Sequence, residues 1–182
     1  MLIRILLNSL MGLIASTTMA LAVAEGTYVE GTHYEVIDIP VETGLEAELP
    51  RKVEVVEVFS YMCVHCYSFD PLLERWEQGK SEQAVFNRLP AVFSPDWALM
   101  AQAFYTAEIL GVTEQMHEPL FAAIHTQPKN LRDEDIMAAL FEDNAGISTE
   151  EFNKSYNSFF VRSRVMQAQA KSRAYGITGV PM

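Results

Sequence analysis

The chain owns two thiols, Cys63 and Cys66, and they are separated by only two residues in the stretch VEVVEVFSYMCVHCYSF. A disulfide between them would close a ring of about four residues and would contribute about 2 kcal/mol in the chain-entropy model, less than a long loop would. This spacing therefore argues against a disulfide whose role is to stabilise the fold. The pattern favours catalytic thiol–disulfide chemistry instead.

A structural disulfide and half of a zinc site are the alternative interpretations of this pair. Zinc would require two further ligands, and His117 and His125 lie eight positions apart instead of the usual spacing of about three to five. We expect His33, His117 and His125 to be surface or satisfied core residues. No metal and no cofactor is expected.

The elements around the cysteines would place the first thiol where it is most reactive. If a strand ends near Tyr61 and a helix begins at Cys63, unpaired backbone N–H groups and the helix dipole favour the thiolate there. His65 adds another donor or positive charge. A stable thiolate makes the corresponding disulfide readily reducible. Cys66, one helical turn further on, is then expected to face the core.

The strand before the motif carries an acid on an apolar face. In VEVVEVF, period-two alternation puts Val55, Glu57 and Phe59 on one side. A carboxylate is costly to bury there without a purpose, so we interpret Glu57 as a functional acid. The alternative is that Glu57 faces solvent and Glu54 faces the core.

The N-terminal segment and the charge indicate the compartment and the class of partner. Arg4 precedes a largely apolar stretch and then small residues up to Ala24, which suits a secretory signal peptide. Polar residues leave no unbroken apolar run of about 18 residues, which disfavours the alternative of a membrane anchor. We expect an exported protein, in a compartment where thiols oxidise. A net charge of −11 without a basic cluster argues against a nucleic-acid partner.

The hydrophobic pattern predicts an α/β domain interrupted by helices. We expect strands at residues 34–39, 53–60 and 84–93, helices at residues 63–80, 95–110, 114–125 and 133–144, and then a helix or helix pair ending near Gly176. Pro71 should kink the first helix. Ser148 and Glu151 form a capping box ahead of the last helices.

The C-x-H-C motif after an apolar strand, the mainly helical block and the closing GVPM resemble the DsbA family of periplasmic thiol:disulfide oxidoreductases. The resemblance implies a thioredoxin-like fold with an inserted all-helical domain. The expected parts are a signal peptide (1–24), the first part of the thioredoxin-like domain (25–94), the helical insertion (95–165) and the second part (166–182). The family continues with two strands and a terminal helix, so a C-terminally truncated chain is expected.

The resemblance also assigns roles to residues. Cys63 would be the attackable sulfur and Cys66 the buried sulfur of a redox-active disulfide, with His65 stabilising the Cys63 thiolate. Glu57 resembles the buried acid that mediates proton transfer for the inner cysteine.

The GVPM segment and the dipeptide between the cysteines complete the expected site. Pro181 would be a cis-proline packed against the disulfide, and Val180 would offer its backbone to an extended substrate chain. Val64 stands where the family most often has proline, and this dipeptide tunes the redox potential.

The function that the resemblance implies is an exported dithiol oxidase that introduces disulfides into secreted or periplasmic proteins. Its partners would be unfolded or reduced exported polypeptides and a DsbB-like membrane oxidase that recharges it. A periplasmic reductase or isomerase of the same fold is one alternative. A non-catalytic periplasmic binding module with a structural disulfide is another.

Overall fold

A computed structural model of the chain describes residues 28–42 and 52–182. The expected signal peptide, residues 1–24, lies outside the described residues. The chain divides between Val36 and Ile37 into two compact units, and all the helices and strands named below belong to the second. Among the described residues, no helix is long and apolar enough to cross a membrane.

The strand expected at residues 34–39 is not formed in the described part of the chain. The segment before it folds into a turn closed by a single bridge between Glu30 and Tyr34. The side chains of Val36 and Ile39 are exposed. The prediction was wrong because an alternating pattern makes a strand only where another strand pairs with it, and no described strand does so here.

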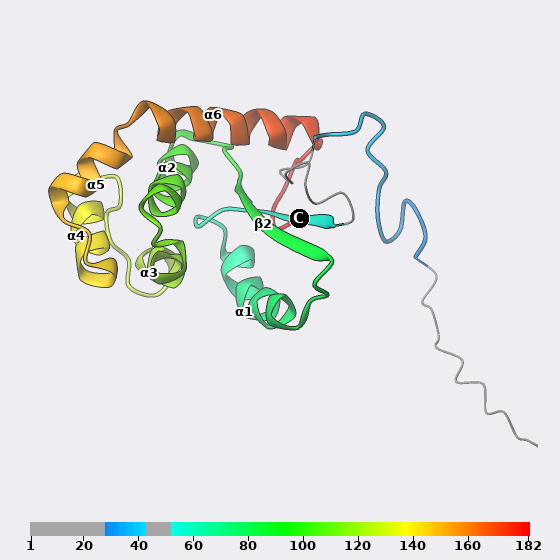
Figure 1. Ribbon diagram of the computed structural model, residues 1–182, viewed down its shortest axis with the longest axis horizontal. Helices are drawn as coiled ribbons and strands as arrows, with labels where there is room; N and C mark the ends of the chain where they lie inside the picture. Colours follow the sequence, from blue (N-terminus) through cyan, green and yellow to red (C-terminus); the bar gives the residue numbers. More distant parts are fainter. Residues whose placement is uncertain (1–27, 43–51) are drawn as a thin grey trace, which may run out of the picture. The chain divides into compact units, whose positions relative to one another are not determined.

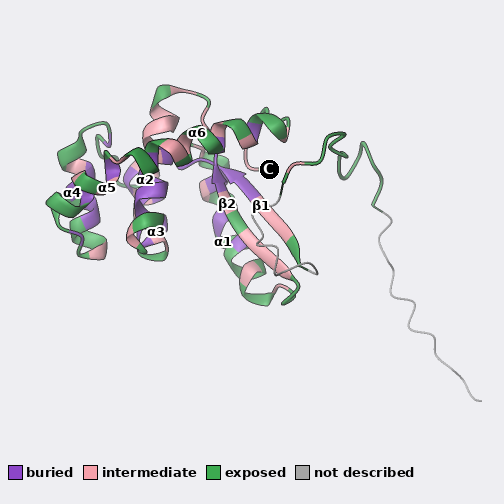
Figure 2. Cartoon of the chain, turned by 45° about the horizontal axis from the view of Figure 1, so that its top comes forward, coloured by how far each residue is buried: buried purple, intermediate pink, exposed green. Residues whose placement is uncertain are grey.

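The described sheet consists of two parallel strands, β1 (Val53–Phe59) and β2 (Ala84–Pro90), at the positions that the sequence predicts. Their register is in step, from Val53 opposite Ala84 to Phe59 opposite Pro90. Parallel strands need a crossover, and here it is α1 (Val64–Gly79). Both strands become buried toward their carboxyl ends (Figure 2), which is where the cysteine motif begins.

The end of the chain pairs with the other edge of β1. The Met182 N–H donates to the Val58 carbonyl at 3.1 Å, and the Val58 N–H donates to the Met182 carbonyl at 2.7 Å. Such a mutual exchange of two hydrogen bonds is the pattern of antiparallel pairing. The GVPM segment is thereby held beside the strand that leads to the cysteines.

Five helices follow the sheet, and their bounds agree with the sequence pattern. They are α2 (Pro95–Leu110), α3 (Thr113–His125), α4 (Glu134–Ala145), α5 (Thr149–Tyr156) and α6 (Phe159–Ala174). The predicted capping box is present, because the Ser148 hydroxyl accepts from the Glu151 N–H. α6 runs unbroken across the expected boundary at residue 165, and the domain limits remain a prediction.

α1 and α6 lie on opposite sides of the two strands, and α2 to α5 gather beyond the strands' carboxyl ends (Figure 1). The core is continuous from the sheet into these helices. Phe59, the last residue of β1, is fully buried and packs edge-on against Tyr61 and Phe104. The helical block therefore packs directly against the segment that carries the cysteines.

Candidate active site

Cys63 is the N-cap of α1. It has the extended backbone usual for a cap, and its Sγ accepts a hydrogen bond from the Cys66 N–H at 3.4 Å. A tight turn leads into it, because the Cys63 N–H donates to the Ser60 carbonyl and the Met62 N–H donates to the Ser60 hydroxyl. The expected position of the first thiol at the mouth of a helix is present.

The closing GVPM segment lies against this thiol. The Cys63 Sγ is 3.5 Å from the Val180 carbonyl oxygen, although the two residues are 117 positions apart in the sequence. The Val180–Pro181 peptide bond is cis, as expected. The Val180 carbonyl therefore adjoins the half-buried sulfur, and the cis bond to Pro181 follows directly after it.

Cys66 differs sharply from Cys63. Its side chain is completely buried, and burial raises the pKa of the Cys66 thiol to about 12. Both cysteines are free thiols in this structure, so their predicted pairing as a redox-active disulfide remains a prediction. The pair is asymmetric, with one accessible sulfur and one sealed sulfur that holds its proton.

His65 lies exposed in the first turn of α1. Among the described residues, none of the recorded hydrogen bonds and ion pairs involves its ring. Its predicted action on the Cys63 thiolate therefore remains a prediction. Val64, which lies between Cys63 and His65, is 54% exposed.

Glu57 is buried, as the functional interpretation requires. Only 6% of the residue is exposed, and Arg88, its cross-strand neighbour, donates from Nε to Glu57 Oε2 at 3.1 Å. Burial raises the pKa of Glu57 to about 7, and the charge of Arg88 offsets only part of this effect. A carboxyl group that titrates near neutral pH is suited to proton transfer.

Glu54, the alternative buried acid, is also covered. Its side chain is 5% exposed, and it accepts a hydrogen bond from Asn87 Nδ2 at 2.8 Å and lies 3.7 Å from Lys171 Nζ. Strand alternation places it on the face opposite Glu57. The sheet therefore buries one acid on each face, and only Glu57 faces the side of α1.

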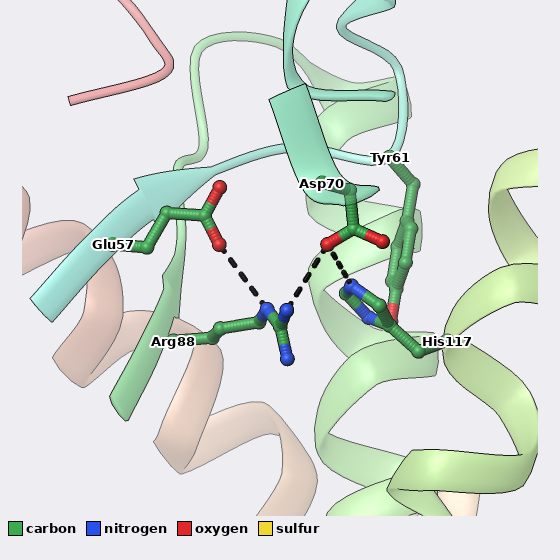
Figure 3. Close-up of polar contacts among 5 residues, drawn as sticks. All are labelled: Glu57, Tyr61, Asp70, Arg88 and His117. Carbon is green, nitrogen blue, oxygen red and sulfur yellow. Dashed lines mark hydrogen bonds and ion pairs between the residues drawn. The ribbon is translucent and has the colours of Figure 1, made fainter. Parts of the chain in front are cut away.

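Glu57 belongs to a chain of buried polar groups that the sequence did not reveal (Figure 3). Arg88 also donates from Nη2 to Asp70 Oδ1 at 3.0 Å, and the same oxygen lies 3.0 Å from His117 Nε2. Burial acts to raise the pKa of Asp70, but the hydrogen bonds and charges of His117 and Arg88 hold it below its usual value. The chain continues to Tyr61, whose hydroxyl is 3.0 Å from His117 Nδ1.

The other histidines are placed as expected. His33 accepts a hydrogen bond from the Val29 N–H on the surface, and His125 is half-buried and bonded. No group of three or more metal-ligating side chains is found in the described ranges, 28–42 and 52–182.

Comparison with known proteins gives a consistent family. Residues 72–182 match the family model for the DSBA-like thioredoxin domain. The chain is 35% identical over 166 residues to the thiol:disulfide interchange protein DsbA of Pseudomonas aeruginosa. The alignment covers 91% of this chain and 76% of that relative. The chain is 38% identical over 146 residues to the protein of the same name from Azotobacter vinelandii, covering 80% and 67%.

Solved structures agree with the sequence matches. The crystal structure of Pseudomonas aeruginosa DsbA has a TM-score of 0.72 at 36% identity and covers 80% of this chain and 73% of that chain. The oxidoreductase DsbA from Xylella fastidiosa has a TM-score of 0.68 at 32% identity, covering 73% and 72%.

Proposed function

The chain belongs to the DsbA family of thiol:disulfide oxidoreductases with a thioredoxin-like fold, and from this premise we propose that Cys63 is the residue that exchanges disulfides with substrate. The observation that carries the proposal is the setting of its sulfur, at the N-cap of α1, beside the buried Cys66 and 3.5 Å from the Val180 carbonyl. A thiolate at such a position is stabilised by the helix N-terminus and is a good leaving group.

In the proposed cycle, the oxidised enzyme carries a Cys63–Cys66 disulfide. A substrate thiolate attacks Cys63 Sγ, the bond between the two cysteines breaks, and Cys66 leaves with the electron pair. A second substrate thiolate then attacks the substrate sulfur of the mixed disulfide and displaces Cys63. Two electrons pass from the substrate dithiol to the enzyme, and the substrate gains one disulfide.

Proton supply to the buried sulfur falls to Glu57 in this proposal. Cys66 leaves as a thiolate, and a thiol with a pKa of about 12 must recover its proton at neutral pH. Glu57 is the nearby acid that titrates at about 7 and contributes to the electrostatic environment of Cys66. His65 favours the thiolate of Cys63 once that sulfur has been displaced.

Substrate binding is assigned to the GVPM segment. An extended chain lying across Pro181 would meet the Val180 backbone and bring its thiol to Cys63. Backbone recognition of this kind is indifferent to side chains, which suits many different polypeptides. We propose reduced, unfolded exported polypeptides as substrates, the periplasm as location, and a DsbB-like membrane oxidase as the partner that restores the disulfide.

Thiol substitution tests this proposal. Cys63→Ser should abolish oxidation of a peptide that holds two reduced cysteines. Cys66→Ser, mixed with the disulfide form of the same peptide, should accumulate a mixed disulfide that mass spectrometry detects, because the Cys63 thiolate attacks the peptide disulfide, one peptide thiol leaves, and no Cys66 thiol is present to displace Cys63. Full activity of Cys63→Ser would exclude the mechanism, and a wild-type chain that does not oxidise the peptide would favour a binding module. The equilibrium of the wild-type couple with glutathione separates oxidase from reductase, because an oxidase keeps its dithiol form even when glutathione is largely oxidised.

A further inference from the structure

Tyr61, two residues before Cys63, is held at both ends by histidines of one helix. Its hydroxyl lies 3.0 Å from Nδ1 of His117, and its carbonyl oxygen lies 2.7 Å from Nε2 of His125. Both histidines belong to α3, two turns apart on its face toward the active site. Tyr61 is 1% exposed; its bond to His117 is buried and its bond to His125 is partly buried.

The donors available give the contact between His117 and Asp70 a direction. Asp70 is ionised and can only accept, so Nε2–H of His117 donates to it. Burial raises the pKa of Tyr61, so its hydroxyl keeps the proton and forms a hydrogen bond with Nδ1 of His117. His117 therefore ties the Tyr61 side chain to Asp70 and, through Arg88, to the sheet.

His125 holds the backbone of the same residue. The Tyr61 carbonyl can only accept, so Nε2–H of His125 donates to it. The His125 ring also stacks on Tyr67, with ring centroids 5.0 Å apart and planes at 9°. Tyr67 closes the first turn of α1 by donating its N–H to the Cys63 carbonyl. His125 thus contacts the residues on both sides of the cysteine motif.

We propose that His117 and His125 are positioning residues for the exchange reaction. By fixing the hydroxyl and the carbonyl of Tyr61, they hold the turn that sets Cys63 as the N-cap of α1. Neither ring has a recorded hydrogen bond to a cysteine sulfur within the described residues, so both act through Tyr61. The inference rests on the proposed role of Cys63.

This role predicts an effect on redox equilibrium as well as on stability. In the dithiol form the Cys63 Sγ accepts from the Cys66 N–H, and that bond depends on the cap geometry. If the Tyr61 carbonyl is released, the turn relaxes and the dithiol form loses this stabilisation. The equilibrium with glutathione then moves toward the disulfide.

The first test compares two substitutions of His125. His125→Leu should shift the glutathione equilibrium about fivefold toward the disulfide, the size expected for one lost hydrogen bond. His125→Gln keeps an N–H donor at a similar reach and should stay within about twofold of wild type. Gln115→Leu, at an exposed position of α3, controls for the added apolar side chain and should have no effect.

The second test removes one atom. Tyr61→Phe deletes the hydroxyl that bonds to Nδ1 of His117, keeps the ring, and should shift the equilibrium in the same direction by about threefold to tenfold. Tyr156→Phe deletes another buried tyrosine hydroxyl in the helical block and should leave the equilibrium unchanged. Thermal melts establish that each variant is folded.

The proposal is overturned if folded Tyr61→Phe and His125→Leu both keep the wild-type equilibrium. Tyr61→Phe preserves the packed ring, so a wild-type equilibrium in that variant overturns the role of His117. The same result in His125→Leu, or in His125→Ala if the leucine variant does not fold, overturns the role of His125. Retained activity in Cys63→Ser would instead refute the proposed function, so the two failures are distinguishable.

Discussion

At the scale of single residues, burial raises the pKa of both Glu57 and Cys66. It raises the pKa of Glu57 to about 7 and that of Cys66 to about 12, while Cys63 sits half-buried at a helix N-terminus. The two cysteines share a motif but not an environment. The asymmetry that exchange chemistry requires therefore comes from depth and not from residue type.

The titration of Glu57 should be visible in stability. Its pKa in the folded protein is raised, so its contribution is present in full below about pH 4.5 and is lost as the pH rises through about 7. Glu57→Gln does not titrate. Its free energy of unfolding relative to wild type should therefore increase across this window by up to roughly 3 kcal/mol, at about 1.4 kcal/mol per pKa unit.

Urea denaturation of both proteins at several pH values measures this difference. Glu54→Gln is the matched control, because that acid lies on the opposite face of β1. A difference between Glu57→Gln and wild type that does not vary with pH would show that Glu57 is already ionised throughout the window.

Alkylation should distinguish the two thiols of the reduced protein. Iodoacetamide at neutral pH should modify Cys63 and leave Cys66 unmodified in the folded chain, because Cys66 is buried and its pKa is about 12. Peptide mapping by mass spectrometry after timed quenching gives the two rates. Unfolding in guanidinium should make them equal, and equal rates in the folded protein would contradict the burial of Cys66.

The sequence predicted the residues of the site better than their connections. The cysteine pair and the burial of Glu57 each leave a local signal in spacing or alternation, whereas the cis bond before Pro181 was expected from the family resemblance. The partners of Glu57 leave none, since Arg88 is 31 positions away and His117 lies 47 positions from Asp70. Which polar groups meet inside a core depends on how the helices and strands pack, and local sequence periodicity does not predict that packing.

At the scale of elements, helix ends were predictable and the first strand was not. Gly111 and Gly146 take left-handed conformations directly after α2 and α4, where glycine has no Cβ to clash. Such end signals involve residues adjacent in sequence. A strand depends on a distant partner, and the segment 34–39 has none among the described residues.

Gly146→Ala tests the helix-end argument. Its φ of 68° disfavours any residue with a Cβ, so the substitution should lower the free energy of unfolding by about 1 kcal/mol. Gly79→Ala is the control, because Gly79 has an ordinary φ at the end of α1 and no atom within 4 Å of the added methyl group. That variant should be neutral or slightly more stable. Equal thermal midpoints for both variants would show that α4 can end without a left-handed residue.

At the scale of the whole unit from Ile37 onward, one side chain joins the sheet to the helices. Arg88 extends from β2, pairs with Glu57 on β1 and with Asp70 on α1, and reaches α3 through His117. Its side chain is 11% exposed. Glu57 on β1 and Asp70 on α1 are therefore both paired with the same cation, Arg88.

Arg88→Met should be the most damaging substitution in this network. It leaves two buried carboxylates without their shared cation, and breaking a buried pair typically lowers the free energy of unfolding by about 3 kcal/mol or more. The loss should grow as the pH rises, because an unpaired Glu57 must take up a proton to remain buried. Adding Glu57→Gln should restore part of the stability at about pH 8 and little at about pH 5, where Glu57 is already protonated.

Arg132→Met removes an exposed ion pair with Asp96 and should not change the thermal midpoint. If Arg88→Met and Arg132→Met behave alike, the buried chain does not hold the sheet to the helices.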